Sequence, residues 1–153
     1  MALTLGAGMA LTPLPAYAGV PTTGPTATLA APVVAPTAAA QVAVDTALAQ
    51  LGDWYVWAGA GPDVFDCSGL TQYAYGAAGM YLPHSSRMQS EMGVPVAFSD
   101  LQPGDLLFFY SPVSHVGMYI GNGQMVHAGT SGDVVKIVDL AYMPGLTAAR
   151  RLA

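Results

Sequence analysis

One cysteine and two histidines supply the residue types of a thiol nucleophile and its proton acceptor. Cys67 is the single cysteine of the chain and stands within the sequence FDCSGL. A thiolate nucleophile takes an imidazole as its partner, and that imidazole needs a polar group to orient it. His115 and His127 are the candidates for these two roles. The indicated chemistry is covalent attack of the thiol on a carbonyl carbon.

The surroundings of Cys67 favour this role over that of a small buried apolar side chain, which is what a lone cysteine more often is. Apolar residues from Leu70 to Ala77 have helical spacing, so a helix is predicted from near Cys67 to Gly79. The unpaired N–H groups and the dipole of its first turn are expected to lower the thiol pKa below its usual value of about 8.5. The same N–H groups can stabilise a tetrahedral oxyanion.

Whether the two histidines can cooperate depends on the hairpin predicted around the turn sequence GNG at 121–123. A two-residue loop would place His127 opposite Met118 and put His115 on the other face of the sheet. A three-residue loop would place His127 opposite Gly117, with His115 as its diagonal neighbour on the same face. A histidine pair therefore requires the second register, and two unrelated strand histidines remain the alternative.

The order of the predicted elements indicates an α+β fold with an antiparallel sheet, because helices come first and strands follow. Helices are predicted over 41–51 and 67–79, with a short third helix that Ser85 or Ser86 would cap and that would run to about 92. Strands are predicted over 106–110, 115–120, 124–128, 134–138 and 147–152. The third histidine, His84, precedes the short helix and is expected at the surface or in a capping position.

Composition restricts the partners and the domain organisation. Four basic and nine acidic residues give a net charge of −5, which excludes a nucleic-acid partner. A single cysteine excludes an intramolecular disulfide and a multi-cysteine zinc site.

The first forty residues carry no charge and are expected to lie outside the folded domain. Residues 1–18 end in Ala-Tyr-Ala and are predicted to be a signal peptide, although no basic residue precedes the apolar run. A disordered alanine-rich leader is the alternative. The run is too short and too interrupted by proline for a transmembrane segment of the mature protein. Residues 19–40 form an Ala/Pro/Thr-rich linker, which leaves 41–153 as the catalytic domain.

Five motifs occur in the order of one known family. They are DCSGL (66–70), LPHSS (82–86), LQPGDL (101–106), HVGMYIGNG (115–123) and HA (127–128). Together they resemble the NlpC/P60 family of cell-wall cysteine peptidases, and the short domain behind an Ala/Pro/Thr linker resembles actinobacterial members. The resemblance implies a papain-like α+β fold, with the helices packed on the antiparallel sheet.

The resemblance also assigns roles to individual residues. Cys67 matches the nucleophile, His115 the general base and His127 the polar residue that orients it. Tyr55 matches a tyrosine near the oxyanion site, where the Cys67 N–H is the other donor. Asp66 and Ser68 match positions that hold the free amino end of the substrate. From the residues alone, Tyr55 also fits a core strand, Asp66 a helix N-cap and Ser68 a structural residue. The sequence departs from the family motif at Ala58, where glycine is common; little effect is expected.

The implied protein is a secreted cysteine endopeptidase that acts outside the cytoplasm or at the cell wall. Its substrates would be the stem peptides of peptidoglycan, cut between D-isoglutamate and a diamino acid, with no metal or cofactor required. Two alternatives remain: an N-acetylmuramoyl-L-alanine amidase on the same scaffold, and a wall-binding module without activity.

Overall fold

The computed structural model describes residues 32–153. The predicted signal peptide at 1–18, and the predicted linker as far as residue 31, lie outside these residues. The first helix, α1 (Ala38–Leu48), begins earlier than the predicted start at 41, inside the range assigned to the linker. Thr37 caps this helix by accepting a hydrogen bond from the Ala40 N–H at 3.1 Å, and the alanines that follow are strong helix formers.

The other helices lie close to their predicted places. Helix α2 (Cys67–Ala77) is capped by Asp66, and the short α3 (Ser86–Gln89) is capped by Ser85 and ends before the predicted limit at 92. Two 3-10 turns, η1 (Phe98–Asp100) and η2 (Leu140–Tyr142), were not predicted. Within the described range, none of the helices combines the length and the hydropathy needed to cross a bilayer.

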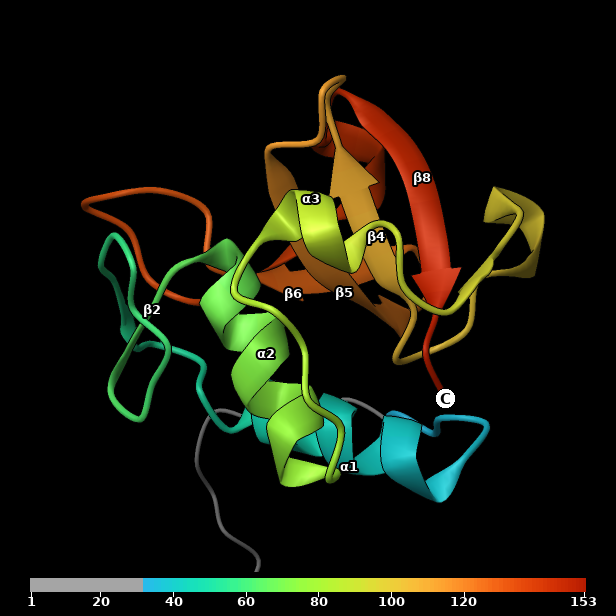
Figure 1. The fold of residues 1–153 in the computed structure, drawn as a ribbon, viewed down its shortest axis with the longest axis horizontal. Coiled ribbons are helices and arrows are strands. Elements are labelled where there is room, and N and C mark those ends of the chain that lie inside the picture. Colours follow the sequence, from blue (N-terminus) through green and yellow to red (C-terminus); the bar gives the residue numbers. More distant parts are fainter. Residues whose placement is uncertain (1–31) are drawn as a thin grey trace, which may run out of the picture. The chain divides into compact units, whose positions relative to one another are not determined.

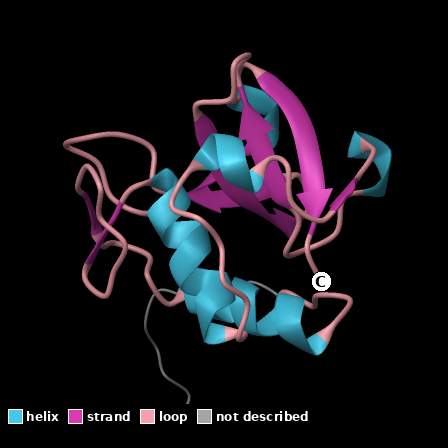
Figure 2. Ribbon diagram, viewed as in Figure 1, coloured by secondary structure: helices cyan, strands magenta, loops and turns pink. Residues whose placement is uncertain are grey.

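Six strands form an antiparallel sheet in the order β3-β8-β4-β5-β6-β7. Their bounds are β3 Val94–Pro95, β4 Leu106–Phe109, β5 His115–Gly121, β6 Gln124–His127, β7 Lys136–Asp139 and β8 Leu146–Arg151. A separate parallel pair joins β1 (Trp54–Tyr55) to β2 (Val64–Phe65). Helices α1 and α2 pack together beside the sheet, and α2 contacts β5 (Figures 1 and 2). The predicted α+β class, with helices on an antiparallel sheet, is confirmed.

Strand β4 is buried on both of its faces, which explains its unbroken apolar sequence. Leu106 and Phe108 belong to the core cluster shared with α1 and α2. Leu107 and Phe109 face the other way, into a smaller cluster with Met125 of β6 and with β8. The sheet is therefore covered on both sides at β4. Its neighbour β5 pairs with β4 and contacts helix α2.

The last strand, β8, lies inside the sheet between β3 and β4. Arg151 near its end donates from Nε to Oδ1 of Asp105 at 2.9 Å and from Nη2 to Oδ2 at 2.8 Å. The Asp105 side chain is 2% exposed and also accepts the Gln102 N–H at 2.8 Å. This bidentate ion pair fixes the end of β8 against the start of β4.

Candidate active site

The start of helix α2 carries Cys67 and is built around Asp66. The Asp66 carboxylate accepts the Gly69 N–H at 2.7 Å, which is the N-cap bond that begins the helix. The Asp66 N–H in turn donates to the Gly59 carbonyl at 2.8 Å. A Cβ atom on Gly69 would overlap that Gly59 carbonyl, so only glycine allows the 56–61 loop to lie against the first turn. The local sequence thus places the cysteine between a helix start and a closely packed loop.

The Cys67 thiol is partly buried and faces strand β5. The backbone N–H groups of Val116, Ser68 and Cys67 lie near the sulfur and act to lower its pKa. Burial has the larger effect and raises the pKa of the thiol above its ordinary value, and the neighbouring Asp66 charge raises it further. The expectation of a pKa below the ordinary thiol value was wrong, because the helix start does not compensate for desolvation.

We expect the alkylation of Cys67 by iodoacetamide to rise with pH through the alkaline range without levelling near neutrality. Only the thiolate reacts, and the raised pKa keeps the thiol protonated at pH 7. Because Cys67 is the only thiol in the chain, mass spectrometry of the intact protein measures its rate directly. A half-point for alkylation below about 8.5, the value of a free cysteine, would contradict the expectation.

The β5–β6 hairpin places both histidines on one face of the sheet, but its turn differs from the predicted one. Met118 pairs with Val126 and Tyr119 with Met125, which is the register that the histidine pair required. The connection is not a three-residue loop, however. A two-residue turn at 122–123 has positive φ at both positions, as a type I′ turn needs, and a bulge before Gly121 shifts the register.

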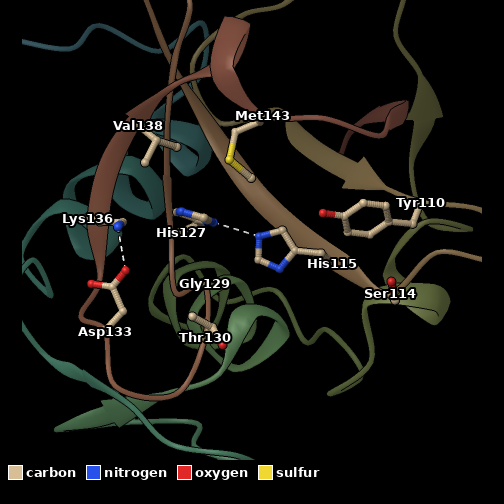
Figure 3. Close-up of a pocket in the computed structure, with 10 residues that line it drawn as sticks. All are labelled: Tyr110, Ser114, His115, His127, Gly129, Thr130, Asp133, Lys136, Val138 and Met143. Carbon is tan, nitrogen blue, oxygen red and sulfur yellow. Dashed lines mark hydrogen bonds and ion pairs between the residues drawn. The ribbon is translucent and has the colours of Figure 1, made fainter.

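His115 and His127 are in direct contact in the hairpin. His115 Nε2 lies 2.8 Å from His127 Nδ1, and Figure 3 shows the two rings meeting through these atoms. A Cβ atom on Gly117 would come within 3.3 Å of His127 Cβ, so the glycine leaves room for the second ring, as the sequence predicted. Burial lowers the pKa of each histidine to about 4. At neutral pH both imidazoles are uncharged.

Two pockets meet at Ser114 and contain all the predicted site residues. The first has a volume of about 400 Å³ and is lined by Tyr55, Asp66, Cys67 and Ser68 among others. The second has a volume of about 420 Å³ and is lined by His115 and His127 (Figure 3). The backbone of Val116 lies next to the Cys67 sulfur, so Cys67 lies beside the strand that carries His115.

His84 lines the first pocket, and the sequence did not predict this position for it. Its Nε2 lies 2.7 Å from Oδ1 of Asp66, the residue that precedes Cys67. The cap of the short helix is Ser85 and not His84. The only signal in the sequence was the position of His84 inside the LPHSS motif, because the contact joins segments that are far apart along the chain.

The carboxylate of Asp66 organises this pocket through both oxygens. Oδ1 accepts the Gly69 N–H and, at 3.4 Å, the Ser68 hydroxyl, and it also contacts His84. Oδ2 accepts the Ala58 N–H at 3.1 Å. Ala58 has φ = 64°, a left-handed conformation in which glycine is more comfortable. The substitution of the common glycine by alanine therefore carries local strain while keeping the N–H bond to Asp66.

Tyr55 lies near Cys67, as expected. Burial raises the pKa of its phenol, and the nearby Cys67 and Asp66 raise it further, so the hydroxyl stays protonated as a hydrogen-bond donor. Arg87 lines the same pocket as one of the four basic residues of the chain. Within residues 32–153, no group of three or more His, Cys, Asp or Glu side chains is placed to hold a metal ion.

Comparison with known proteins gives matches to one family. The profile of the NlpC/P60 family matches residues 52–147. A probable endopeptidase of Mycobacterium tuberculosis is 52% identical over 108 residues, which are 71% of this chain and 28% of that protein. A probable endopeptidase of Corynebacterium glutamicum is 46% identical over 110 residues, 72% of this chain and 53% of that protein. The chain thus spans less than two thirds of either relative.

Solved structures of the same family share the fold. The P60 domain of an antigen from Mycobacterium avium subspecies paratuberculosis has a TM-score of 0.69 at 31% identity, covering 74% of this chain and 94% of that one. RipD from Mycobacterium tuberculosis has a TM-score of 0.68 at 32% identity, covering 76% of this chain and 99% of that one. RipD is described as a non-catalytic NlpC/p60 domain protein adapted to peptidoglycan binding.

Proposed function

The chain belongs to the NlpC/P60 family, and we propose that it is a secreted cysteine peptidase that hydrolyses peptidoglycan stem peptides between D-isoglutamate and a diamino acid. The observation that carries this proposal is the thiol of Cys67 at the start of α2, held against β5 beside the buried His115–His127 pair. The description of the curated relatives as probable endopeptidases supports the reaction type.

Cys67 is the nucleophile and His115 is its general base. His115 Nε2 is engaged by His127, so Nδ1 is the nitrogen that accepts the thiol proton as sulfur attacks the peptide carbonyl. Because the thiol pKa is raised and the pKa of His115 is about 4, the proton moves with the attack and no ion pair is stored beforehand. His127 orients the His115 ring through the 2.8 Å contact.

The remaining steps use groups that are already in place. The Cys67 N–H and the Tyr55 hydroxyl stabilise the oxyanion. His115 then returns its proton to the leaving amine as the C–N bond breaks, and water hydrolyses the thioester. Because the leaving amine must reach His115, the amino side of the scissile bond occupies the pocket lined by the histidines. The acyl side occupies the pocket lined by Asp66 and Ser68.

The bond that is cleaved can be identified from defined muropeptides. The proposal expects digestion to release a peptide that begins with the diamino acid, identified by mass spectrometry. Release of intact stem peptides from muramic acid would establish the amidase alternative. No release of either product, from a folded protein with a free thiol, would remove the hydrolase proposal.

A wall-binding module without activity is the second candidate, and RipD makes it worth testing. Cys67 and His115 are both present here and lie on adjoining elements, which favours catalysis. Sedimentation with insoluble peptidoglycan, combined with an assay for soluble products, separates the candidates. Binding without product release would favour the module.

Asp66 is proposed to hold the free amino end of the stem peptide, together with Ser68. Oδ2 of Asp66 has one protein donor, the Ala58 N–H, and so keeps a lone pair for an ammonium group. We expect Asp66→Asn to raise KM about tenfold for peptides with a free amine, since a charge-assisted bond is lost. Peptides with an acetylated amine should change much less.

Steady-state kinetics on matched free and acetylated peptides measure this difference. Asparagine caps helices nearly as well as aspartate, so the variant should keep the start of α2. Asp63→Asn is the matched control, because Asp63 is exposed in the preceding loop and does not line the pocket. An equal change of KM for both peptides would remove Asp66 from amine recognition.

A further inference from the structure

The pocket that contains the histidine pair also carries one acid and one base. Its lining includes Asp133, from the connection between β6 and β7, and Lys136, the first residue of β7. Lys136 Nζ lies 2.5 Å from Oδ2 of Asp133, and Figure 3 shows this ion pair on the side of His127 away from His115. Both histidines have a pKa of about 4. At neutral pH the ion pair therefore supplies the only charges among the residues of 32–153 that line this pocket.

Asp133 is fixed by the backbone around it. Its carbonyl accepts the Tyr55 N–H at 2.9 Å, and its own Oδ1 accepts the Val134 N–H at 2.8 Å. The contact with Lys136 and then the Val134 N–H lower the pKa of the carboxyl, so it is ionised at neutral pH. Each carboxylate oxygen can accept more than one hydrogen bond, so Asp133 can bind a second cationic group beside Lys136.

Lys136 has the same spare capacity for an anion. Its ammonium group carries three N–H donors, and the contact with Asp133 uses at most one of them. The side chains of Lys136 and Asp133 are 46% and 34% exposed, so a ligand in the pocket can reach both. A group that brings a carboxylate and an ammonium together would match the pair, because each new charge would lie beside an opposite one.

The rest of the lining suits an aliphatic chain between the reaction centre and the ion pair. Met143 and Val138 are apolar, and the volume of about 420 Å³ lies within the range of small-ligand pockets. The proposed mechanism puts the leaving amine at His115, so the side chain of the amino-side residue enters this pocket. The side chain of a diamino acid is aliphatic along its length and charged at its end, which is the pattern that the lining fits.

We propose that Lys136 and Asp133 select the diamino acid by the end of its side chain. Lys136 binds a carboxylate at that end, and Asp133 binds the ammonium group next to it. A side chain that ends in an ammonium group alone, as in lysine, meets Asp133 but is repelled by Lys136. The substrate class is therefore a stem peptide whose diamino acid ends in a free amino-carboxylate group. The inference rests on the proposed function, which places the diamino acid on the amino side of the cut.

Three matched stem peptides test the selection. They differ only in the diamino acid, which is meso-diaminopimelate, the same residue with its side-chain carboxylate amidated, or L-lysine. For the wild type we expect kcat/KM to be about tenfold higher for the first peptide, because the other two lack the charge-assisted contact with Lys136. Lys136→Gln should lower kcat/KM about tenfold for the diaminopimelate peptide only, and so abolish the preference.

A charge reversal gives the test a direction. Lys136→Glu should invert the preference, because two carboxylates then face the end of the side chain, and the lysine peptide should become the better substrate. Asp133→Asn should lower kcat/KM for all three peptides, since each carries the ammonium group. Arg150→Gln is the matched control. It removes one positive charge from β8, and Arg150 lines a different pocket, so the preference should stay as in the wild type.

The outcomes that overturn this inference differ from those that overturn the proposed function. Equal kcat/KM for the three peptides in the wild type, or a preference that both Lys136 variants leave unchanged, would remove the ion pair from substrate selection. If no peptide is cleaved, the proposed function fails. Calorimetry of the same peptides with the Cys67→Ala protein then decides the inference, because their affinities should follow the same order. Equal affinities, or no binding of any peptide, would overturn it.

Discussion

Replacing Cys67 with alanine is expected to lower kcat for stem-peptide hydrolysis at least about a thousandfold. The remaining N–H groups of the first turn cannot form the thioester, so the covalent route is lost. Alanine differs from cysteine only by the sulfur atom, and the pocket around Asp66 is unchanged. Peptide affinity, measured by calorimetry, should therefore stay close to that of the wild type.

The two histidine variants should lose kcat in a defined order. His115→Gln removes the base, and its loss of kcat is expected to approach that of Cys67→Ala. Residues that act as one catalytic unit show non-additive losses, because removing any one of them disables the unit. His127→Asn keeps a polar partner for His115 and should cost less, about ten- to a hundredfold in kcat. Hydrolysis that persists in Cys67→Ala would exclude the thiol mechanism, whatever the histidine variants do.

Gly69→Ala is expected to destabilise the fold by at least about 3 kcal/mol. A Cβ atom there would overlap the Gly59 carbonyl, which is backbone and cannot rotate away. Relief would require the 56–61 loop to separate from α2, which would break the bond from the Asp66 N–H to that carbonyl. Urea unfolding of the two proteins measures the loss as a lower midpoint at constant slope.

Gly76→Ala provides the matched control within the same helix. No atom lies within 4 Å of the position of its Cβ, and alanine is the better helix former, so a gain of up to about 1 kcal/mol is expected. If both substitutions had similar effects, close packing at Gly69 would not explain why the site needs glycine there.

Local patterns predicted the site elements well, and the hairpin shows both their strength and their limit. Alternation along the strands predicted that a histidine pair needs Gly117 opposite His127, and the rings do meet at 2.8 Å. The predicted cause of this register, a three-residue loop, was wrong, because the hairpin has a two-residue turn and a bulge before Gly121. Bulges depend on how neighbouring strands pack, so the turn sequence could not distinguish the two solutions.

Features that depend on distant parts of the chain were the ones that the sequence did not predict. His84 reaches Asp66 only after the chain folds back, and its neighbours indicate a helix cap at least as well. The pKa of Cys67 was predicted from the helix start, but β5 and the surrounding loops bury the thiol and reverse the direction. The early start of α1 has a similar origin, because Gln41 binds the backbone of Val33 and Ala35 and orders residues ahead of the helix.

The interior position of β8 has a consequence for the biosynthesis of the protein. Cys67 is translated early, whereas β4 gains its second neighbour only when Leu146–Arg151 has been made. A nascent chain therefore carries Cys67 without the completed sheet that supports His115. The sheet that carries His115 is complete only after β8 has joined it between β3 and β4. Translation that stops before Arg151 also removes the ion-pair partner of Asp105 and leaves that buried carboxylate without a compensating charge.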